Sequence, residues 1–241
     1  MIRMTLIGVF TAGAGVAHAG DIFHLDFDTQ GAGYSTSVSE FVDSSSRYFS
    51  WAYGDGRNLL GNDIRYYRPG GTSNDNGFFA AQNVGGSGTE MSLTTDSIDI
   101  SDASDLMFSI ELAEDTERNG GESWNAEDFV SFTYRVDGGS WEEMFSVEPN
   151  SDNDNTRPLF DGDRSNAITH EFRAYTFDLS GIYGDIIEFQ VFWNLTDADV
   201  DLAIDNLLLT GTTVAVVPLP AAGWAGLGML GLLGAARMRR S

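Results

Sequence analysis

The chain has 241 residues, with 36 acidic against 13 basic side chains and a formal net charge of −23 at pH 7. Four basic residues, Arg3, Arg237, Arg239 and Arg240, lie near the termini, which leaves nine arginines and no lysine beside the acidic residues in between. This charge argues against nucleic acid or anionic lipid as a partner, because phosphate binding needs basic patches. The sequence has no cysteine, which excludes disulfides and thiol chemistry.

The first predicted element is a signal peptide at residues 1–19. Arg3 is followed by an apolar run from Leu6 to Ala17 and by the small-x-small pattern Ala17-His18-Ala19, which predicts cleavage after Ala19. The alternative, an ordinary N-terminal core helix, needs a polar face, and no charged residue lies between Arg3 and Asp21. The rest of the chain is therefore expected outside the cytoplasm.

Residues 20–212 alternate apolar and polar residues over short runs separated by Gly, Asn, Asp and Ser clusters, a pattern that predicts antiparallel strands. Asp137-Gly138-Gly139 is a hairpin signal. Only Asp102–Asp105 and Asp178–Gly184 have room for a turn of helix. The predicted strands, about ten after merging the shortest, are Ile22–Phe27, Phe41–Val42, Arg47–Tyr53, Gly77–Gln82, Met91–Thr95, Ile98–Ile100, Leu106–Leu112, Asp128–Val136, Trp141–Val147, Glu171–Leu179, Ile186–Asn194 and Leu202–Thr210.

Many short strands with polar turns predict one all-β domain, an antiparallel β-sandwich of jelly-roll type. The segments GFFAAQNV, IDISDASDLMFSIELAE, DFVSFTYRVDGGSWEEMF and DLAIDNLLLTG resemble successive strands of jelly-roll modules in secreted bacterial surface proteins. That fold is also similar to MAM and carbohydrate-binding modules. The resemblance implies a non-catalytic domain for adhesion, glycan binding or an accessory role.

Two groups of acidic residues are candidate calcium sites, because Ca²⁺ takes six to eight oxygen ligands. In the first group, Asp152, Asp154, Thr156 and Asp163 have a spacing that resembles an EF-hand loop, although Arg157 stands where that loop needs glycine. A solvated acidic loop is the alternative. In the second group, Asp26 and Asp28 of the first strand would share an ion with Asp205 and Asn206 of the last, since first and last strands are usually neighbours in jelly rolls. Ordinary outward-facing alternation is the alternative there.

A third acidic stretch, Asp197-Ala198-Asp199-Val200-Asp201, has carboxylates at alternate positions, which would share one face of a strand. Sandwich enzymes of the laminarinase type use an alternating Glu-x-Asp-x-Glu strand, and glycosidases need such a carboxyl pair. Here all three residues are Asp, and they precede the last predicted strand. A solvent-facing loop and a calcium site are the other interpretations.

Aromatic side chains in loops are candidate sugar-binding residues, because their flat apolar faces stack on sugar rings. Tyr66, Tyr67 and Trp124 fall in predicted loops, whereas Trp141 and Trp193 are expected in the core.

The last predicted element, residues 213–241, is a sorting signal. Val217-Pro218-Leu219-Pro220-Ala221 is followed by an apolar Gly/Leu run and by Arg237, Arg239 and Arg240. An apolar run with a basic end fits a transmembrane-like helix whose arginines stay cytoplasmic. The segment resembles the PEP-CTERM class of sorting signals in its VPLPA variant, which implies recognition and removal by an exosortase-type membrane protease. A plain C-terminal membrane anchor is the alternative.

These features predict an exported, non-enzymatic surface or extracellular-matrix protein, stabilised by Ca²⁺ and binding polysaccharide. A glycan hydrolase or lyase of the same fold is the alternative from another class, and a purely structural surface protein is a second one.

Overall fold

A computed structural model of the chain contains two compact units, Ala19–Thr212 and a second one made of Met1–His18 and Thr213–Ser241. Within the described residues no helix is long and apolar enough to cross a membrane. The predicted sorting signal, from Val217 to Arg240, lies outside the described part of the chain. The structure describes residues 17–44, 46–54, 67–68, 72–73, 76–85, 91–114, 124–149, 158–163, 167–198 and 200–214.

The described residues form strands and turns without any helix, as the alternating pattern predicts. The predicted bounds of β4, β7, β8 and β15 coincide with the observed ones, while β2, β5, β6 and β13 were not predicted. The strands are β1 (Ala17–Leu25), β2 (Tyr34–Thr36), β3 (Phe41–Ser44), β4 (Arg47–Tyr53), β5 (Tyr67–Arg68), β6 (Thr72–Ser73), β7 (Gly77–Gln82), β8 (Met91–Thr95), β9 (Ile98–Asp99), β10 (Ala103–Ala113), β11 (Phe129–Val136), β12 (Glu142–Glu148), β13 (Leu159–Phe160), β14 (Arg173–Leu179), β15 (Ile186–Asn194) and β16 (Asp201–Val214).

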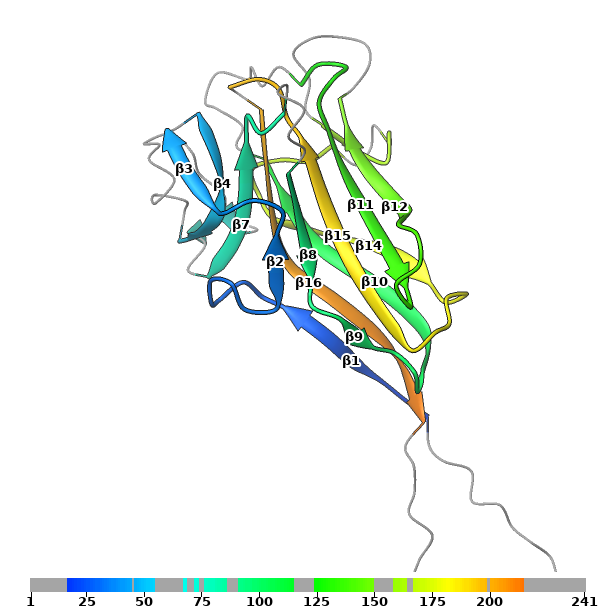
Figure 1. Cartoon of the computed structure of the whole chain (residues 1–241). Coiled ribbons are helices and arrows are strands. Elements are labelled where there is room, and N and C mark those ends of the chain that lie inside the picture. The colour runs from blue at the N-terminus through cyan, green and yellow to red at the C-terminus, as the bar shows by residue number, and fades with distance from the viewer. Residues whose placement is uncertain are drawn as a thin grey trace, which may run out of the picture. The chain divides into compact units, whose positions relative to one another are not determined.

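The strands build two seven-stranded antiparallel sheets, which confirms the predicted β-sandwich (Figure 1). Sheet A has the order β14-β10-β16-β7-β4-β3, with β1 paired to β16, and sheet B has the order β13-β12-β11-β15-β8-β2, with β9 paired to β15. From β7 onward the chain repeatedly crosses between the sheets. The first and last strands are neighbours, as expected for a jelly roll.

The predicted hairpin between β11 and β12 is present. Asp137 and Gly138 both have positive φ values, 51° and 69°, and the Gly139 N–H donates to the Val136 carbonyl at 2.9 Å. Two successive positive φ values define a type I′ turn, whose twist matches that of the flanking strands. The Asp137 carboxylate also accepts the backbone N–H groups of Asp185 and Ile186, each at 2.9 Å, and so ties this turn to the start of β15.

The two places with room for a helical turn hold single hydrogen-bonded turns instead. The Ala103 N–H donates to the Ile100 carbonyl at 3.0 Å, and the Ile182 N–H donates to the Leu179 carbonyl at 2.9 Å. Each turn bonds a residue to the third one before it and then gives way to extended chain, so neither becomes a helix.

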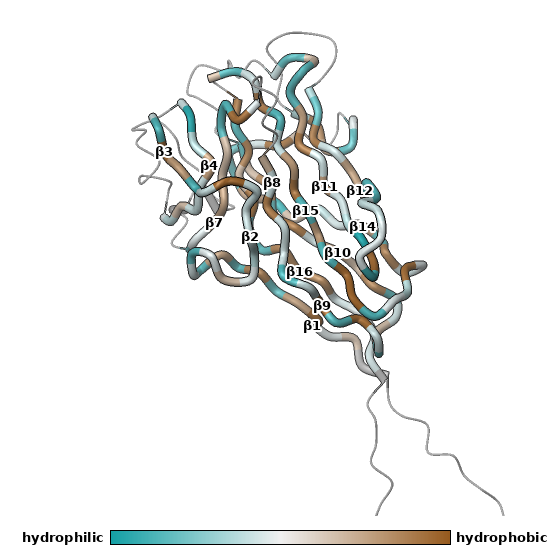
Figure 2. Tube along the Cα trace, viewed as in Figure 1, coloured by the Kyte–Doolittle hydropathy of each residue, from teal (hydrophilic) through white to brown (hydrophobic). Residues whose placement is uncertain are grey.

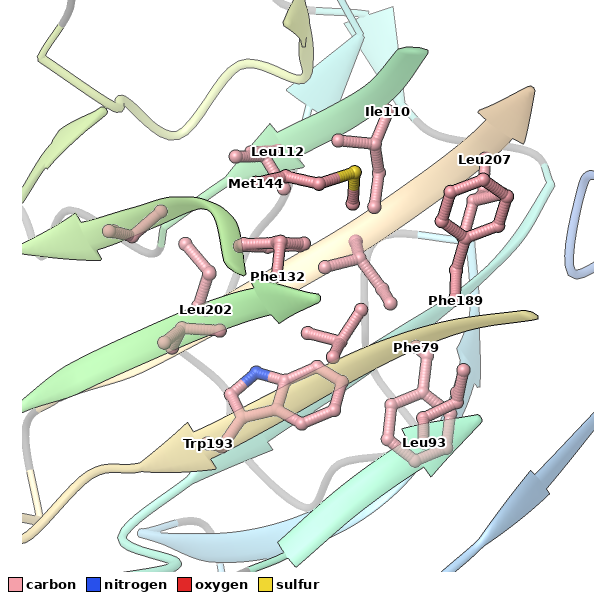
Figure 3. Packing of buried hydrophobic residues seen from close by; sticks show 14 of the residues in the cluster. Phe79, Leu93, Ile110, Leu112, Phe132, Met144, Phe189, Trp193, Leu202 and Leu207 are labelled. Carbon is pink, nitrogen blue, oxygen red and sulfur yellow. The ribbon is translucent and has the colours of Figure 1, made fainter. Parts of the chain in front are cut away.

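The main core lies between the sheets and is rich in aromatic rings. Phe79 of sheet A contacts Trp193 of sheet B with ring centroids 5.7 Å apart, and Phe108 contacts Phe189 at 4.6 Å. Figure 3 shows side chains of β7, β10 and β16 meeting those of β8, β11, β12 and β15. Burying one such side chain stabilises the fold by about 1.5–3 kcal/mol, so this interface supplies most of the driving force for folding.

A second buried cluster covers the outer face of sheet A. All six residues of β7 are buried, because its outward side chains are covered as well as its inward ones. Figure 2 shows apolar stretches along the strands of both sheets and hydrophilic residues in many of the turns. The outer part of sheet A is therefore closed to a large ligand at these positions, which are Tyr48, Ala52, Phe78, Ala80, Ala113, Phe172 and Ala203.

Candidate functional site

The structure describes all four residues of the predicted cation site near the first and last strands, and calcium binding there stays a prediction. The Asp26 carboxylate accepts the Asp28 N–H at 3.0 Å, and the buried Asp205 accepts the Asn206 N–H at 2.7 Å. The backbone of Asn206 has φ 47°. Its side-chain Nδ2 donates to Glu111 Oε2 at 2.9 Å, and its Oδ1 lies 3.0 Å from His24 Nε2. No group of three or more His, Asp or Glu residues in the described part of the chain is placed to hold a metal ion. Local hydrogen bonds engage one oxygen each of Asp26 and Asp205.

Of the other predicted calcium loop, the structure describes only the end, which includes Asp163. Asp152 and Asp154 lie outside the described residues. Asp163 is exposed and closes a turn in which its N–H donates to the Phe160 carbonyl at 2.9 Å. Calcium binding by this loop stays a prediction.

The three alternating aspartates before the last strand do not occupy one strand. Asp197 lies in the segment before β16, where its Oδ2 accepts the Asn125 amide at 2.8 Å. Asp201 is the first residue of β16 and is buried, while Asp199 lies outside the described residues. The sequence spacing therefore does not place Asp197 and Asp201 as alternate residues of a single strand.

The predicted sugar-binding aromatics have different outcomes. Tyr66 lies outside the described residues, and Tyr67 begins the short strand β5. Trp124 is 1% exposed and belongs to the core, so its prediction as an exposed stacking residue is wrong. The turn that follows it is held by Asp128, which accepts the Asn125 N–H at 2.8 Å, and the indole packs inward beside that turn.

The outer face of sheet B is the best candidate binding surface among the described residues. Alternation along β15 buries Ile187, Phe189, Val191 and Trp193 and points the residues between them outward. The strand register places Thr94, Gln190 and Thr133 in one row across β8, β15 and β11. We call this surface the sheet B outer face; its residues are Ser92, Thr94, Phe129, Ser131, Thr133, Arg135, Glu188, Gln190, Phe192 and Asn194.

One end of the sheet B outer face carries two phenylalanines. Phe129 is 36% exposed and stacks on Phe192 of the neighbouring strand, with ring centroids 5.8 Å apart and planes 20° apart. Both rings lie on the side of the strand that is otherwise polar. Stacking between them keeps each ring in a defined orientation and gives an apolar surface on the water-facing side of the sheet.

The other end carries an arginine held from two sides. Arg135 Nε donates to Glu188 Oε2 at 2.7 Å, and the guanidinium carbon lies 4.6 Å from the centroid of the half-buried Trp141 ring. The hydrogen bond to Glu188 raises the pKa of Arg135, which keeps the guanidinium charged. Ion pair and cation–π contact together hold the Trp141 ring against Arg135 at this end of the face.

Between these ends the surface offers hydroxyl and amide groups. The Gln190 amide donates to Thr94 Oγ1 at 3.2 Å, and the Thr133 hydroxyl donates to the Gln190 carbonyl at 3.4 Å. Ser131 donates to Glu143 of β12 at 2.9 Å. Glu188 is the one carboxylate among the ten residues, and Arg135 neutralises it; Glu143 and Glu148 of β12 are exposed on the same side of sheet B. Such a surface can bond hydroxyl groups and disfavours an anionic ligand.

Sequence reasoning treated Phe129 and Phe192 only as strand residues. A signal for them does exist, because both are large apolar residues at positions whose strand neighbours of the same parity are polar: Ser131 and Thr133 on β11, and Gln190 and Asn194 on β15. That signal becomes usable only when the register shows that the two phenylalanines lie on one face.

No protein-family model matches this sequence, and no curated protein is detectably similar to it. The solved structures that are similar in fold include a cyclase, a carbohydrate-binding module and an adhesin domain. A Stig cyclase from Fischerella sp. TAU has 10% identity and a TM-score of 0.41, covering 80% of this chain and 90% of its own. A carbohydrate-binding module that recognises mannan has 13% identity and a TM-score of 0.38, covering 80% and 98%.

The third is a cleaved adhesin domain of Lys-gingipain from Porphyromonas gingivalis w83, with 14% identity and a TM-score of 0.42, covering 80% of this chain and all of its own. At identities and TM-scores this low, no residue role and no activity is transferred from these proteins to the chain.

Proposed function

We propose that residues 20–212 form a non-enzymatic carbohydrate-binding module of an exported surface or extracellular-matrix protein, and that the module binds polysaccharide on the sheet B outer face. The observation that carries this proposal is the stacked pair of Phe129 and Phe192, of which Phe129 is clearly exposed, beside hydroxyl and amide side chains. Aromatic faces pack on the apolar C–H faces of sugar rings, while the polar groups bond their hydroxyls.

The other outer surface is a poorer candidate. Phe78, Ala80 and Ala203 of sheet A are fully buried on their outward side, so a polymer has no access to these side chains. On sheet B the outward residues of β15 all keep partial exposure. The difference between the two sheets supports sheet B as the binding surface.

The test is polysaccharide binding by the domain from Gly20 to Thr212, measured by affinity electrophoresis and calorimetry against a panel of soluble plant, algal and bacterial polysaccharides. Phe129→Ala is expected to weaken binding at least about tenfold, as truncation of an aromatic anchor does in other interfaces. The matched control is Tyr183→Ala, which removes a 72% exposed aromatic from the loop between β14 and β15. Equal losses in both variants would refute the assignment of the face.

The same panel tests the absence of enzymatic activity. Incubation followed by an assay for new reducing ends or unsaturated products is expected to show none. Any turnover by the purified domain would favour the glycan hydrolase or lyase instead.

Export and tail removal belong to the same proposal, and a cut after Ala19 has a structural consequence. β1 begins at Ala17, so the cut removes its first three residues and leaves Gly20–Leu25. Mass spectrometry of the secreted protein is expected to show Gly20 as its first residue and loss of the segment after the VPLPA motif, by an exosortase-type protease. A retained tail would favour the plain membrane anchor.

A further inference from the structure

We infer that the ligand is an uncharged, extended glycan chain that lies along β11 and β15 and is held at both ends of the sheet B outer face, by Phe129 and Phe192 at one end and by Trp141 at the other. This inference rests on the proposed function and adds to it the charge and the length of the ligand.

The length follows from the strand register. Phe129 and Arg135 are six residues apart on β11, which corresponds to about 20 Å at ~3.4 Å per residue. Phe192 lies opposite Ser131, and Glu188 lies opposite Arg135, so both ends of the face are built on the same two strands. The Arg135 guanidinium lies over the Trp141 ring, 4.6 Å from its centroid, which places Trp141 at this end of the face. A ligand that touches both aromatic ends is therefore an extended chain of several sugar rings.

The neutral character follows from how the charges of the face are used. Arg135 is its one cation, and both its Nε and its flat face are already engaged, by Glu188 and by Trp141. The ion pair with Glu188 offsets the charge of Arg135, so the guanidinium attracts a uronic acid or sulfate group less than an unpaired arginine would. Glu188 in turn is neutralised by Arg135. The remaining eight residues carry no charge, and the carboxylates of Glu143 and Glu148 on the adjoining β12 accept hydrogen bonds from the hydroxyls of Ser131 and Ser146.

The charges elsewhere in the domain also disfavour the binding of anionic polymers. The strongly acidic domain repels them at long range. At physiological ionic strength exposed charges are screened beyond about 8 Å, so groups on the face itself decide the contact energy. A neutral polymer needs no charged partner there and loses nothing to the acidic surroundings.

Trp141 is suited to act as a stacking surface because its position is fixed before binding. The Arg135 guanidinium lies against the ring, and Glu188 holds the guanidinium. A ring fixed in this way loses little side-chain entropy when a sugar packs on it. Phe129 and Phe192 are fixed at the other end by their mutual stacking.

The experiment measures Kd by calorimetry for neutral linear oligosaccharides of increasing length, from the cello-, manno- and laminari- series. Oligogalacturonides and chitosan oligomers serve as anionic and cationic counterparts. Wild type is expected to gain affinity with length until the chain reaches both aromatic ends, and then to show a plateau that added salt does not change. Trp141→Ala and Phe129→Ala are each expected to weaken the longest oligosaccharides about tenfold or more and to flatten the length dependence.

Trp141→Phe, which keeps an aromatic ring, is expected to restore most of the affinity, and Tyr183→Ala to leave it unchanged. Thermal unfolding of each variant shows whether the fold is intact. Loss of affinity in Phe129→Ala but not in Trp141→Ala, at every length, would leave the proposed function standing and overturn the two-ended arrangement. Tighter, salt-sensitive binding of either charged series would overturn the neutral class. Failure of wild type to bind any polysaccharide would overturn the proposed function itself.

Discussion

The buried Asp128 carboxylate connects two loops of the domain, and replacing it tests how much that connection contributes to stability. Its side chain is 1% exposed and accepts three hydrogen bonds, from the Asn125 N–H at 2.8 Å, the Thr196 N–H at 2.7 Å and the Thr196 hydroxyl at 2.8 Å. The carboxylate thus joins the turn before β11 to the segment after β15. Asp128→Ala removes this acceptor from the backbone N–H groups of Asn125 and Thr196 and from the Thr196 hydroxyl.

The expected cost follows from these three bonds. A hydrogen bond to a charged group contributes about 1.5–3 kcal/mol net, and donors left in a buried site lose their solvation as well. Water can reach the half-buried Asn125 and Thr196, so each bond is expected to contribute an energy near the lower end of this range. The free energy of unfolding is therefore expected to fall by about 3–5 kcal/mol. For a domain of this size that lowers Tm by roughly 10–15 °C.

Urea denaturation followed by tryptophan fluorescence measures this change. Glu127→Ala is the matched control, because Glu127 is the adjacent acidic residue but is exposed, and it is expected to change stability by less than about 0.5 kcal/mol. Asp128→Asn keeps one carbonyl acceptor and is expected to lose about half as much as Asp128→Ala. A loss below about 1 kcal/mol for Asp128→Ala, or equal losses for Asp128→Ala and Glu127→Ala, would refute this account.

Three further predictions concern backbone packing, pH and calcium. A Cβ at Gly77 would lie 1.9 Å from the Phe27 carbonyl oxygen, so Gly77→Ala is expected to lower Tm strongly, whereas Gly181→Ala, with nothing within 4 Å, is not. The Ser101 N–H and hydroxyl hold the pKa of Asp99 below its usual 3.8, so this contribution to stability is complete above that pH and is lost as pH falls through the lowered value; carboxyl NMR titration measures it. Calcium is expected to raise Tm relative to EDTA, and magnesium is not; an unchanged Tm would remove the calcium predictions.

Much of the fold was predictable because its strands carry strong local signals. β15 alternates over nine residues and β8 over five, and turn residues bound them, so pattern and structure agree there. β13 has two residues, and its pairing with Val147 and Glu148 of β12 depends on distant chain. No local pattern of two residues distinguishes such a strand from a loop.

Site residues were harder to predict, because each depends on a contact between distant residues. Trp124 looked exposed since it lies between strands, but the Asp128 anchor places it in the core. Asp26 directly follows β1 and Asp205 lies on β16, which are neighbouring strands, but φ 47° at Asn206 interrupts the alternation of β16. A residue with positive φ in a strand changes the direction of the side chains around it, and the sequence does not reveal which residue that is.

The difference between the two sheets is nevertheless visible in the strand patterns once the fold is known. β7 has an apolar or small residue at five of six positions, and a strand of this kind is buried on both faces. β15 alternates, as a strand with one solvated face does. In such a strand an outward Phe192 gains nothing from the core. One exposed phenylalanine would be unremarkable on any protein surface, but Phe192 has Phe129 stacked beside it from the next strand. Two rings brought together on the water-facing side, from residues more than sixty positions apart, form the apolar patch on which the proposed binding surface depends.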